Sequence, residues 1–423
     1  MKPYLLAMSS MLALGAVDAA AAQVSGHGEY LARAGDCIAC HTAPGGQPYA
    51  GGLGLKTPLG ILYSTNITPD PQTGLGQYSF EDFDNAVRRG VRKDGSSLYP
   101  AMPFPSYAQV SEADMRDLYG YFMTGVTPVA HANRSPDIPW PLSIRWPLGW
   151  WSWMFAPKPA VVEAPPATER AARGAYLVEG LGHCGSCHTP RALTLEEKTL
   201  ADDRSKAYLS GGAPIDGWIA KDLRGSAMTG LGKWSEADLV EFLRTGKNNQ
   251  SAAFGGMKDV IENSLQYLSD EDLHAIAQYL KSLSPDEAPL HSGADAQAST
   301  TTADLHALRV ESDGARIYAD NCMACHRSDG KGYEKTFPGL SANTVLNDPQ
   351  PDSVIRIVLA GATGTATDAA PTAYTMPAFA WRLSDPEVAA VASFIRSAWG
   401  NTGSAVSAKD VAHVRHDLSS AGQ

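Results

Sequence analysis

Apolar residues recur at helical spacing in three successive stretches of the chain, and each stretch predicts the same series of helices. A short opening segment combines a glycine with an aromatic residue, and these segments begin at Gly28, Gly174 and Gly314. A second helix ends at a glycine, a usual stop signal, over residues 80–90, 235–246 and 352–361. A closing helix follows at residues 111–122, 269–283 and 384–399. The pattern predicts an all-α chain of three similar repeats with long loops.

Local signals mark where several of these helices begin. A serine followed three residues later by an aspartate forms a capping box at Ser79 and Asp82 and again at Ser235 and Asp238. In such a box the serine oxygen and the carboxylate bind the free amides of the first turn. Pro386 stands in the first turn of the last closing helix, where its missing N–H removes no helical bond.

Each stretch carries one copy of the pentapeptide Cys-x-x-Cys-His between its opening and second helices. The copies span residues 37–41, 184–188 and 322–326, and together they use all six cysteines of the chain. This run is the attachment signature of c-type haem. Side chains three and four residues apart share one face of a helical turn, so two thiols can bond the haem edge while the imidazole reaches the iron.

The motif therefore predicts three covalently bound haem c groups and an electron carrier. The predicted thioether residues are Cys37, Cys40, Cys184, Cys187, Cys322 and Cys325, and the predicted iron ligands are His41, His188 and His326. Redox-active disulfides or one half of a zinc site are the alternatives. Neither alternative predicts a histidine directly after the second cysteine three times.

A methionine at a similar distance after each second helix is the candidate for the other axial ligand. Haem iron in cytochromes c is commonly held by histidine and methionine, a pair that raises the reduction potential. The matching residues are Met102, Met257 and Met376. Proline follows the first and the last of them, whereas Met257 lacks it, and Met228 is the alternative in the second repeat.

The amino terminus predicts export. Residues 4–17 are mostly apolar after Lys2, and alanines precede Gln23, as in a cleaved signal peptide over residues 1–22. A retained membrane anchor is the alternative, but the apolar run is shorter than the roughly 20 residues that span a bilayer. We therefore expect the mature protein at the periplasmic face of the bacterial cytoplasmic membrane.

The repeats and the composition between them predict the domain boundaries. Cytochrome c domains are expected at residues 23–156, 169–284 and 305–400, with linkers at residues 157–168 and 285–304 and a C-terminal tail at residues 401–423. The first linker is rich in proline and is expected to be extended, and the second is expected to be looser. The tail is expected either to cross another module or a partner, or to be partly disordered.

The net charge of the chain bears on whether it binds nucleic acid. The chain carries a formal net charge of -11, with 44% hydrophobic and 19% charged residues. Nucleic acids attract basic surfaces. An acidic globular chain of this kind is therefore not expected to bind nucleic acid.

A Trp-rich segment at residues 138–155 holds five of the nine tryptophans, and its prolines and Arg145 exclude a simple spanning helix. Tryptophan favours the polar boundary of a bilayer and also protein interfaces. The segment is therefore a candidate for membrane contact, for a quinone site, or for packing against another module or a partner. Its candidate residues are Trp140, Trp146, Trp150, Trp151 and Trp153.

From about residue 28 to residue 401 the chain resembles the three-haem cytochrome c subunit of the membrane-bound quinohaemoprotein alcohol dehydrogenase. The motifs that carry this resemblance lie at residues 35–37, 40–46, 63–70, 99–103, 182–185, 187–191 and 375–379. The same architecture is shared by cytochrome subunits of flavin-dependent gluconate, sorbitol and fructose dehydrogenases, and by one for aldehyde dehydrogenase.

The resemblance implies three tandem class I cytochrome c-like domains and an electron-transfer role in an alcohol:quinone oxidoreductase complex. A large partner subunit with pyrroloquinoline quinone (PQQ) and its own haem would oxidise the alcohol, and a further small subunit would be possible. PQQ would be bound by the partner only. This chain would pass the electrons to ubiquinone in the membrane.

Two other classes of protein remain as alternatives. A haem enzyme such as a peroxidase needs an open axial position on the iron, whereas three matched methionines favour closed, six-coordinate sites. A soluble periplasmic shuttle would carry the same haems but would have no fixed partner.

Overall fold

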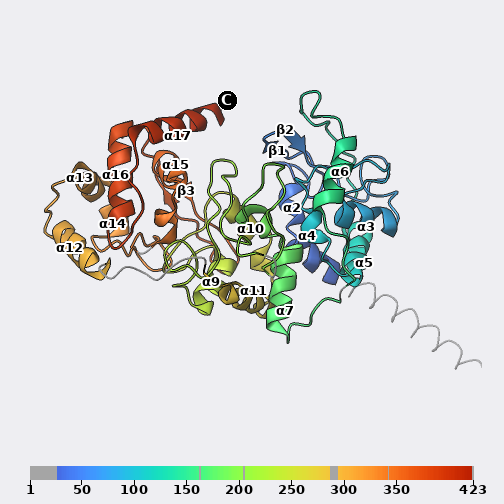
Figure 1. Ribbon diagram of the computed structural model, residues 1–423, viewed down its shortest axis with the longest axis horizontal. Helices are drawn as coiled ribbons and strands as arrows, with labels where there is room; N and C mark the ends of the chain where they lie inside the picture. The colour runs from blue at the N-terminus through green and yellow to red at the C-terminus, as the bar shows by residue number, and fades with distance from the viewer. Residues whose placement is uncertain (1–25, 162, 203–204, 286–293, 342, 422–423) are drawn as a thin grey trace, which may run out of the picture. The chain divides into compact units, whose positions relative to one another are not determined.

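The computed structural model describes residues 26–161, 163–202, 205–285, 294–341 and 343–421 (Figure 1). The predicted signal peptide and the start of the mature chain lie outside the described residues. The chain forms two compact units, one of residues 1–166 with 175–183 and one of residues 167–174 with 184–423. Both units are helix-rich, as the apolar pattern predicts.

The first unit opens with a helix over residues 26–34 and the short α2 (Cys37–Cys40). A hairpin of β1 (Gly54–Thr57) and β2 (Gly60–Tyr63) follows, with Gly54 paired to Tyr63. The remaining helices are α3 (Phe80–Arg89), α4 (Phe104–Tyr107), α5 (Glu112–Gly120), η1 (Tyr121–Gly125), α6 (Trp146–Phe155) and η2 (Tyr176–Leu181). α7 (Arg170–Ala175) precedes η2 in the chain.

The second unit contains α8 (Gly185–His188), α9 (Glu236–Thr245), α10 (Gly256–Asn263), η3 (Leu265–Tyr267) and α11 (Asp270–Ser282). It continues with α12 (Ala294–His306), α13 (Asp313–Asn321), α14 (Met323–His326), η4 (Thr344–Asn347) and α15 (Asp352–Ala360). The strand pair β3 (Ala362–Thr363) and β4 (Thr375–Met376), then α16 (Asp385–Ser397) and α17 (Ala408–Ala421), complete it.

The predicted helix signals are confirmed. Ser79 accepts a hydrogen bond from the N–H of Asp82 at 3.1 Å, and Asp82 accepts one from the N–H of Ser79 at 2.9 Å. The same box opens α9 at Ser235. α3 ends at Gly90, whose φ of 65° lies in the left-handed region that glycine adopts without strain.

The opening and closing helices of all three repeats cross at a glycine. A Cβ built on Gly28 would lie 2.2 Å from the carbonyl oxygen of Asp117. The corresponding distances are 2.1 Å from Gly174 to Ala275 and 2.3 Å from Gly314 to Ala390. Each crossing also places an aromatic Cβ of the closing helix within 2.8 Å. Only glycine allows the two backbones to approach this closely, which explains why it recurs at this position.

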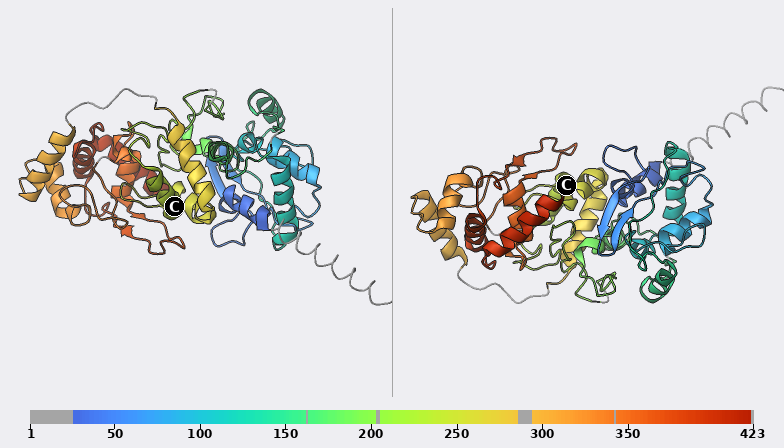
Figure 2. Two further views of the ribbon diagram at one scale, coloured as in Figure 1. Left: turned by 90° about the horizontal axis from the view of Figure 1, so that it is seen from below. Right: turned by 90° about the horizontal axis from the view of Figure 1, so that it is seen from above.

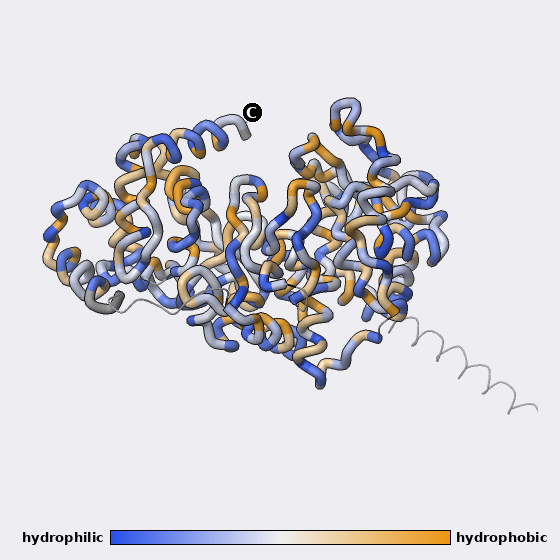
Figure 3. Tube along the Cα trace, viewed as in Figure 1, coloured by the Kyte–Doolittle hydropathy of each residue, from blue (hydrophilic) through white to orange (hydrophobic). Residues whose placement is uncertain are grey.

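Buried apolar side chains join these helices into cores. In the third repeat, α15 and α16 carry Ile355, Leu359, Val388 and Val391, each at most 1% exposed. The apolar stretch of α15 is visible in the hydropathy colouring (Figure 3). In the first unit, Tyr49, Phe83 and Phe122 are buried in edge-on and tilted ring contacts.

Two connecting segments are more ordered than their composition indicates. The second linker was expected to be loose, but its residues 294–304 lie in α12 (Ala294–His306), and Leu305 of this helix is 2% exposed in the core of the third repeat. The tail was expected either to cross another module or a partner, or to be partly disordered; its residues 408–421 form α17, which contacts α15 and α16 (Figure 2). Val411 and Val414 of α17 are buried in that core. Burial against their own repeat stabilises both segments.

Among the described residues, no helix combines the length and the apolar character needed to cross a bilayer.

Candidate haem sites

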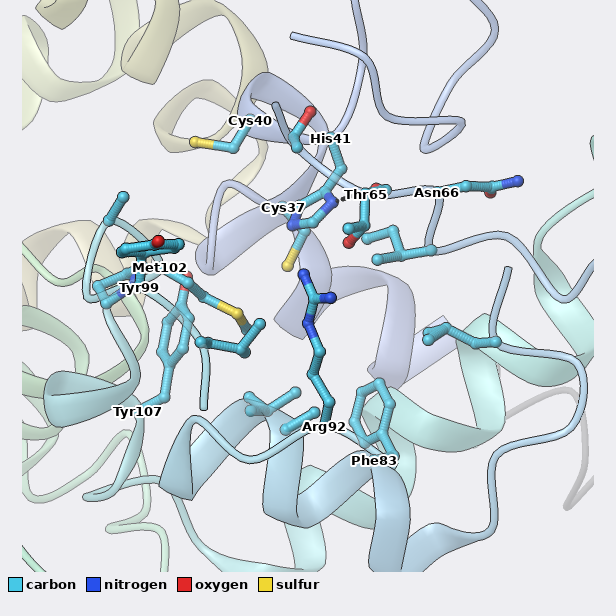
Figure 4. Close-up of a pocket in the computed structure, with 18 of the residues that line it drawn as sticks. Cys37, Cys40, His41, Thr65, Asn66, Phe83, Arg92, Tyr99, Met102 and Tyr107 are labelled. Carbon is cyan, nitrogen blue, oxygen red and sulfur yellow. Dashed lines mark hydrogen bonds between the residues drawn. The ribbon is translucent and has the colours of Figure 1, made fainter. Parts of the chain in front are cut away.

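The first site is a cavity of about 530 Å³ inside the first unit. Cys37, Cys40, His41 and Met102 all line it. Figure 4 shows the sulfur of Cys37, the imidazole of His41 and the side chain of Met102 around this one space. Residues far apart in the sequence therefore line one cavity, and their role in holding a haem stays a prediction.

The third site repeats this arrangement in the second unit. A cavity of about 230 Å³ is lined by Cys322, Cys325, His326 and Met376. Met376 ends β4 and pairs with Ala362 of β3. This short strand pair follows the turn at the end of α15 and gives Met376 a fixed backbone position.

The three motif histidines share one hydrogen-bond pattern. Nδ1 of His41 lies 2.7 Å from the carbonyl oxygen of Thr65, Nδ1 of His188 lies 2.7 Å from that of Lys221, and Nδ1 of His326 lies 3.0 Å from that of Pro338. A carbonyl oxygen only accepts, so Nδ1 carries the proton in each ring. Nε2 is then left with a free lone pair, which is the form of imidazole that binds a metal ion.

Burial keeps these histidines neutral. Loss of solvent lowers the pKa of His41 and of His326 below the usual value, and it lowers the pKa of His188 to about 4. The hydrogen bonds to the carbonyl groups oppose these shifts but are the smaller effect. At neutral pH all three rings can therefore act as iron ligands without first losing a proton.

The cysteines of each motif differ in exposure. Cys37, Cys184 and Cys322 are half-buried, and burial raises the pKa of each thiol to about 12. The second cysteine of each motif is exposed, and all six are free of disulfides. In the part of the chain that the structure describes, no group of three or more His, Cys, Asp or Glu side chains is arranged to hold a metal ion.

Buried polar residues fix the carbonyl group that orients His41. Asn66 is 2% exposed, and its side-chain amide donates to Thr73 at 3.0 Å and to the carbonyl oxygen of Val129 at 2.8 Å. Its side-chain oxygen accepts from the N–H and the hydroxyl of Thr68. Asn66 directly follows Thr65, so its bonds fix the local backbone. They thereby position the carbonyl oxygen of Thr65 that His41 binds.

The second site retains two candidates for its axial methionine. Met257 is the second residue of α10. Met228 lies in a turn, and its backbone N–H donates to the hydroxyl of Ser226 at 3.2 Å. Both methionines are half-buried. Met257 also differs from Met102 and Met376 because it lies on a helix, so its role as ligand stays a prediction.

Comparison with known proteins agrees with this geometry. The family model of cytochrome c matches residues 311–399, which hold the third motif and Met376. The gluconate 2-dehydrogenase cytochrome c subunit of Pantoea cypripedii is 55% identical over 404 residues, which cover 92% of this chain and 89% of that protein. The chain belongs to this family of cytochrome c subunits.

Other members of the family carry different names. The cytochrome c subunit of the quinone-dependent alcohol dehydrogenase of Gluconobacter oxydans is 50% identical over 390 residues, covering 92% of this chain and 81% of that protein. The fructose dehydrogenase cytochrome subunit of Gluconobacter japonicus is 39% identical over 409 residues, which cover 92% of this chain and 82% of that protein. Cytochrome c subunits of dehydrogenases that differ in substrate thus share almost the whole length of the chain.

The residues of this cytochrome c fit covalently attached haem. The first cavity lies in the range of about 300–1,000 Å³ that is usual for ligand and cofactor sites. It offers two thiols, one neutral imidazole with a free nitrogen, and one thioether sulfur. When bound, haem would supply an iron that gains or loses one electron, and this chain's residues would fix its position and its axial ligands.

Several residues at the first cavity belong to none of the sequence motifs. Arg92, Lys93 and Arg145 line it together with His183. Nδ1 of His183 lies 2.9 Å from the carbonyl oxygen of Leu181, and its ring packs edge-on against Tyr107. The two arginines stand in no recurrent spacing, so no sequence signal connects them before the chain folds.

Proposed function

We propose that the chain carries three tandem cytochrome c domains, each with one covalently bound haem c. Three repeated features support this proposal: the glycine crossing of opening and closing helices, the Cys-x-x-Cys-His turn, and the histidine held by a backbone carbonyl group. The third feature carries the most weight, because it leaves a metal-binding nitrogen free in all three histidines. Met102, Met257 and Met376 complete the proposed sites.

In this proposal the chain is the electron-transfer subunit of a dehydrogenase complex. The haem sites are closed by histidine and methionine, which suits electron transfer rather than chemistry at an open iron. Oxidation of an alcohol releases two electrons, whereas each haem iron accepts one, so a series of haems can pass them singly. The substrate is oxidised on the partner subunit, and ubiquinone is the acceptor.

The first candidate for the partner is the large PQQ and haem subunit of an alcohol dehydrogenase, with a possible further small subunit. Motifs along the whole chain support it, as do relatives of 49–50% identity that are named for that enzyme. The second candidate is a flavin-dependent gluconate dehydrogenase. The 55% identity to the gluconate 2-dehydrogenase subunit favours this second candidate.

The proposed location is the periplasmic face of the cytoplasmic membrane, with the Trp-rich segment in contact with the lipid. Trp146, Trp150 and Trp153 of α6 are 71%, 61% and 78% exposed. Exposed tryptophans on one short helix match the composition of the polar boundary of a bilayer, where the ring is partly apolar and the N–H stays hydrated. Attachment without a spanning helix is the expected mode.

The deciding experiment is purification of the native complex from membranes in detergent, followed by identification of the large subunit. Ethanol, gluconate, sorbitol and acetaldehyde are then each tested for reduction of the haems. We expect three haems per chain and reduction by one of these substrates, with ethanol and gluconate separating the two candidates. A chain purified without a partner would support the soluble shuttle instead.

The enzyme alternative has its own test. The reduced protein is exposed to carbon monoxide, which binds iron only at an open or displaceable axial position. We expect no change in the haem spectrum at any of the three sites. Ready binding at one site would contradict the closed coordination and favour a haem enzyme.

A further inference from the structure

Two arginines of the first unit, Arg92 and Arg145, face the haem cavity. Arg92 extends into the cavity (Figure 4), and Arg145 also lines it. The neighbouring Lys93 is paired differently, with Nζ 3.3 Å from a carboxylate oxygen of Asp82. Among the described residues, no ion pair includes Arg92 or Arg145.

The two guanidinium groups also repel each other. Burial, followed by the charge of Arg92, lowers the pKa of Arg145, and Tyr99 and Asp94 oppose this only in part. Asp94 also lines the cavity, and its carboxylate accepts the N–H of Ser96 at 2.9 Å. Two cations that share a half-buried cavity are stabilised by an anion that enters it.

One tight turn holds both arginines. The N–H of Arg92 donates to the carbonyl oxygen of Ser96 at 2.9 Å, and Val91 is bridged to Ser97. Nη1 of Arg145 donates to the carbonyl oxygen of Ser97 at 3.0 Å, and its guanidinium lies 4.9 Å from the centre of the Tyr99 ring. The same backbone continues to Met102, so the cationic pair and the proposed iron ligand share one support.

Haem carries two propionate carboxylates in addition to the two vinyl groups through which cysteines attach it. We propose that Arg92 and Arg145 bind the propionate carboxylates of the haem at the first motif. The planar guanidinium matches a carboxylate in shape and in the direction of its N–H groups. The inference rests on the proposed function in one respect, namely that the first motif holds a haem.

This assignment gives the Trp-rich segment a link to the first haem. Arg145 belongs to that segment, which is also held to the first repeat by the hydroxyl of Tyr99, 3.3 Å from the carbonyl oxygen of Leu142. The ring of Trp151 packs edge-on against Phe104, two residues after Met102. Positive charge beside the haem favours the reduced form, because that form carries the additional electron. Loss of either arginine therefore lowers the reduction potential of the first haem.

The test uses the full complex with the variants Arg92→Gln and Arg145→Gln. Arg116→Gln is the matched control, since Arg116 is exposed and pairs with Glu112 outside the cavity. A spectroelectrochemical titration resolves the haems, and the Met102→His variant identifies which wave belongs to the first one. We expect that wave alone to move to lower potential in both glutamine variants, and to move less in Arg92→Lys and Arg145→Lys.

A second measurement covers the case in which a glutamine variant fails to bind haem. Resonance Raman spectra of the two lysine variants report the propionate bending modes directly, and we expect these modes to shift. An unchanged first-haem wave in loaded glutamine variants, or unchanged propionate modes in both lysine variants, would overturn the inference. A haem stain and a haem count are made on the same samples. Three haems in the control variant support the three-haem proposal even when the propionate inference fails, whereas fewer than three haems in the control contradict the three-haem proposal itself.

Discussion

At the scale of single residues, the position of one nitrogen proton in each motif histidine is the informative detail. The carbonyl oxygens of Thr65, Lys221 and Pro338 fix that proton on Nδ1. Each carbonyl group comes from a segment far along the chain from its histidine. The iron-binding form of the ring is thus a product of the folded structure and is ready before any metal is bound.

The prediction at this scale concerns the axial methionines. Histidine in place of methionine removes the ligand that raises the potential. We expect Met102→His and Met376→His each to lower the reduction potential of one haem, measured by redox titration. Met154→Leu is the control, because Met154 is 57% exposed on α6. No shift in Met102→His would remove Met102 from the iron site.

Replacement of methionine by histidine also tests which methionine is the axial ligand at the second site. Met257→His is expected to lower the potential of one further haem, and Met228→His is expected to leave all three unchanged. Redox titrations of both variants provide the comparison. The reverse result would assign Met228 as the ligand.

At the scale of helices, the glycine crossings determine how closely the opening and closing helices pack. Gly28→Ala would place a methyl group 2.2 Å from the carbonyl oxygen of Asp117, so the helices must separate. We expect a loss of about 1–3 kcal/mol in the free energy of unfolding, measured by urea denaturation of the haem-loaded protein. Gly26→Ala is the control, since no atom lies within 4 Å of the added Cβ.

A second prediction at this scale concerns how η2 is held. The hydroxyl of Tyr176 donates to a carboxylate oxygen of Asp114 at 2.5 Å and accepts the N–H of Ser111 at 3.0 Å, and all three residues are buried. Tyr176→Phe leaves both partners without this bond. We expect a loss of about 1–3 kcal/mol in stability by urea denaturation. Tyr267→Phe, at a 42% exposed position, is expected to change it less.

At the scale of the whole molecule, the prediction concerns membrane attachment. Trp150→Gln combined with Trp153→Gln is expected to weaken binding of the isolated subunit to lipid vesicles, measured by co-sedimentation. The control is Trp381→Gln, because Trp381 is 80% exposed but lies outside the Trp-rich segment. Equal loss of binding in both variants, or release of the native subunit by salt or alkali alone, would contradict the role of α6.

Local signals explain what could be predicted from the sequence. Capping boxes and stop glycines are decided within one helical turn, so the bounds of α3 and α9 follow from Ser79, Gly90 and Ser235. The Cys-x-x-Cys-His motif likewise predicts the cysteines and histidines of the candidate sites. Met102 and Met376 line the same cavities as their motifs, and their role as iron ligands stays a prediction.

The features that the sequence does not predict depend on contacts between segments that are distant along the chain. α12 and α17 gain their stability from burial of residues such as Leu305 and Val411 in the third core, which composition does not reveal. Arg92 and Arg145 meet only because the Trp-rich segment returns to the turn that precedes Met102. No helical period or motif connects residues brought together in this way.

The size of the first cavity has a consequence for biosynthesis. A space of about 530 Å³ with many apolar lining residues leaves those side chains in contact with water until a cofactor fills it. Attachment of the haem would therefore stabilise the folded first repeat, as any ligand does that binds only the folded state. Chains that miss this attachment are expected to be cleaved by proteases more readily than loaded ones.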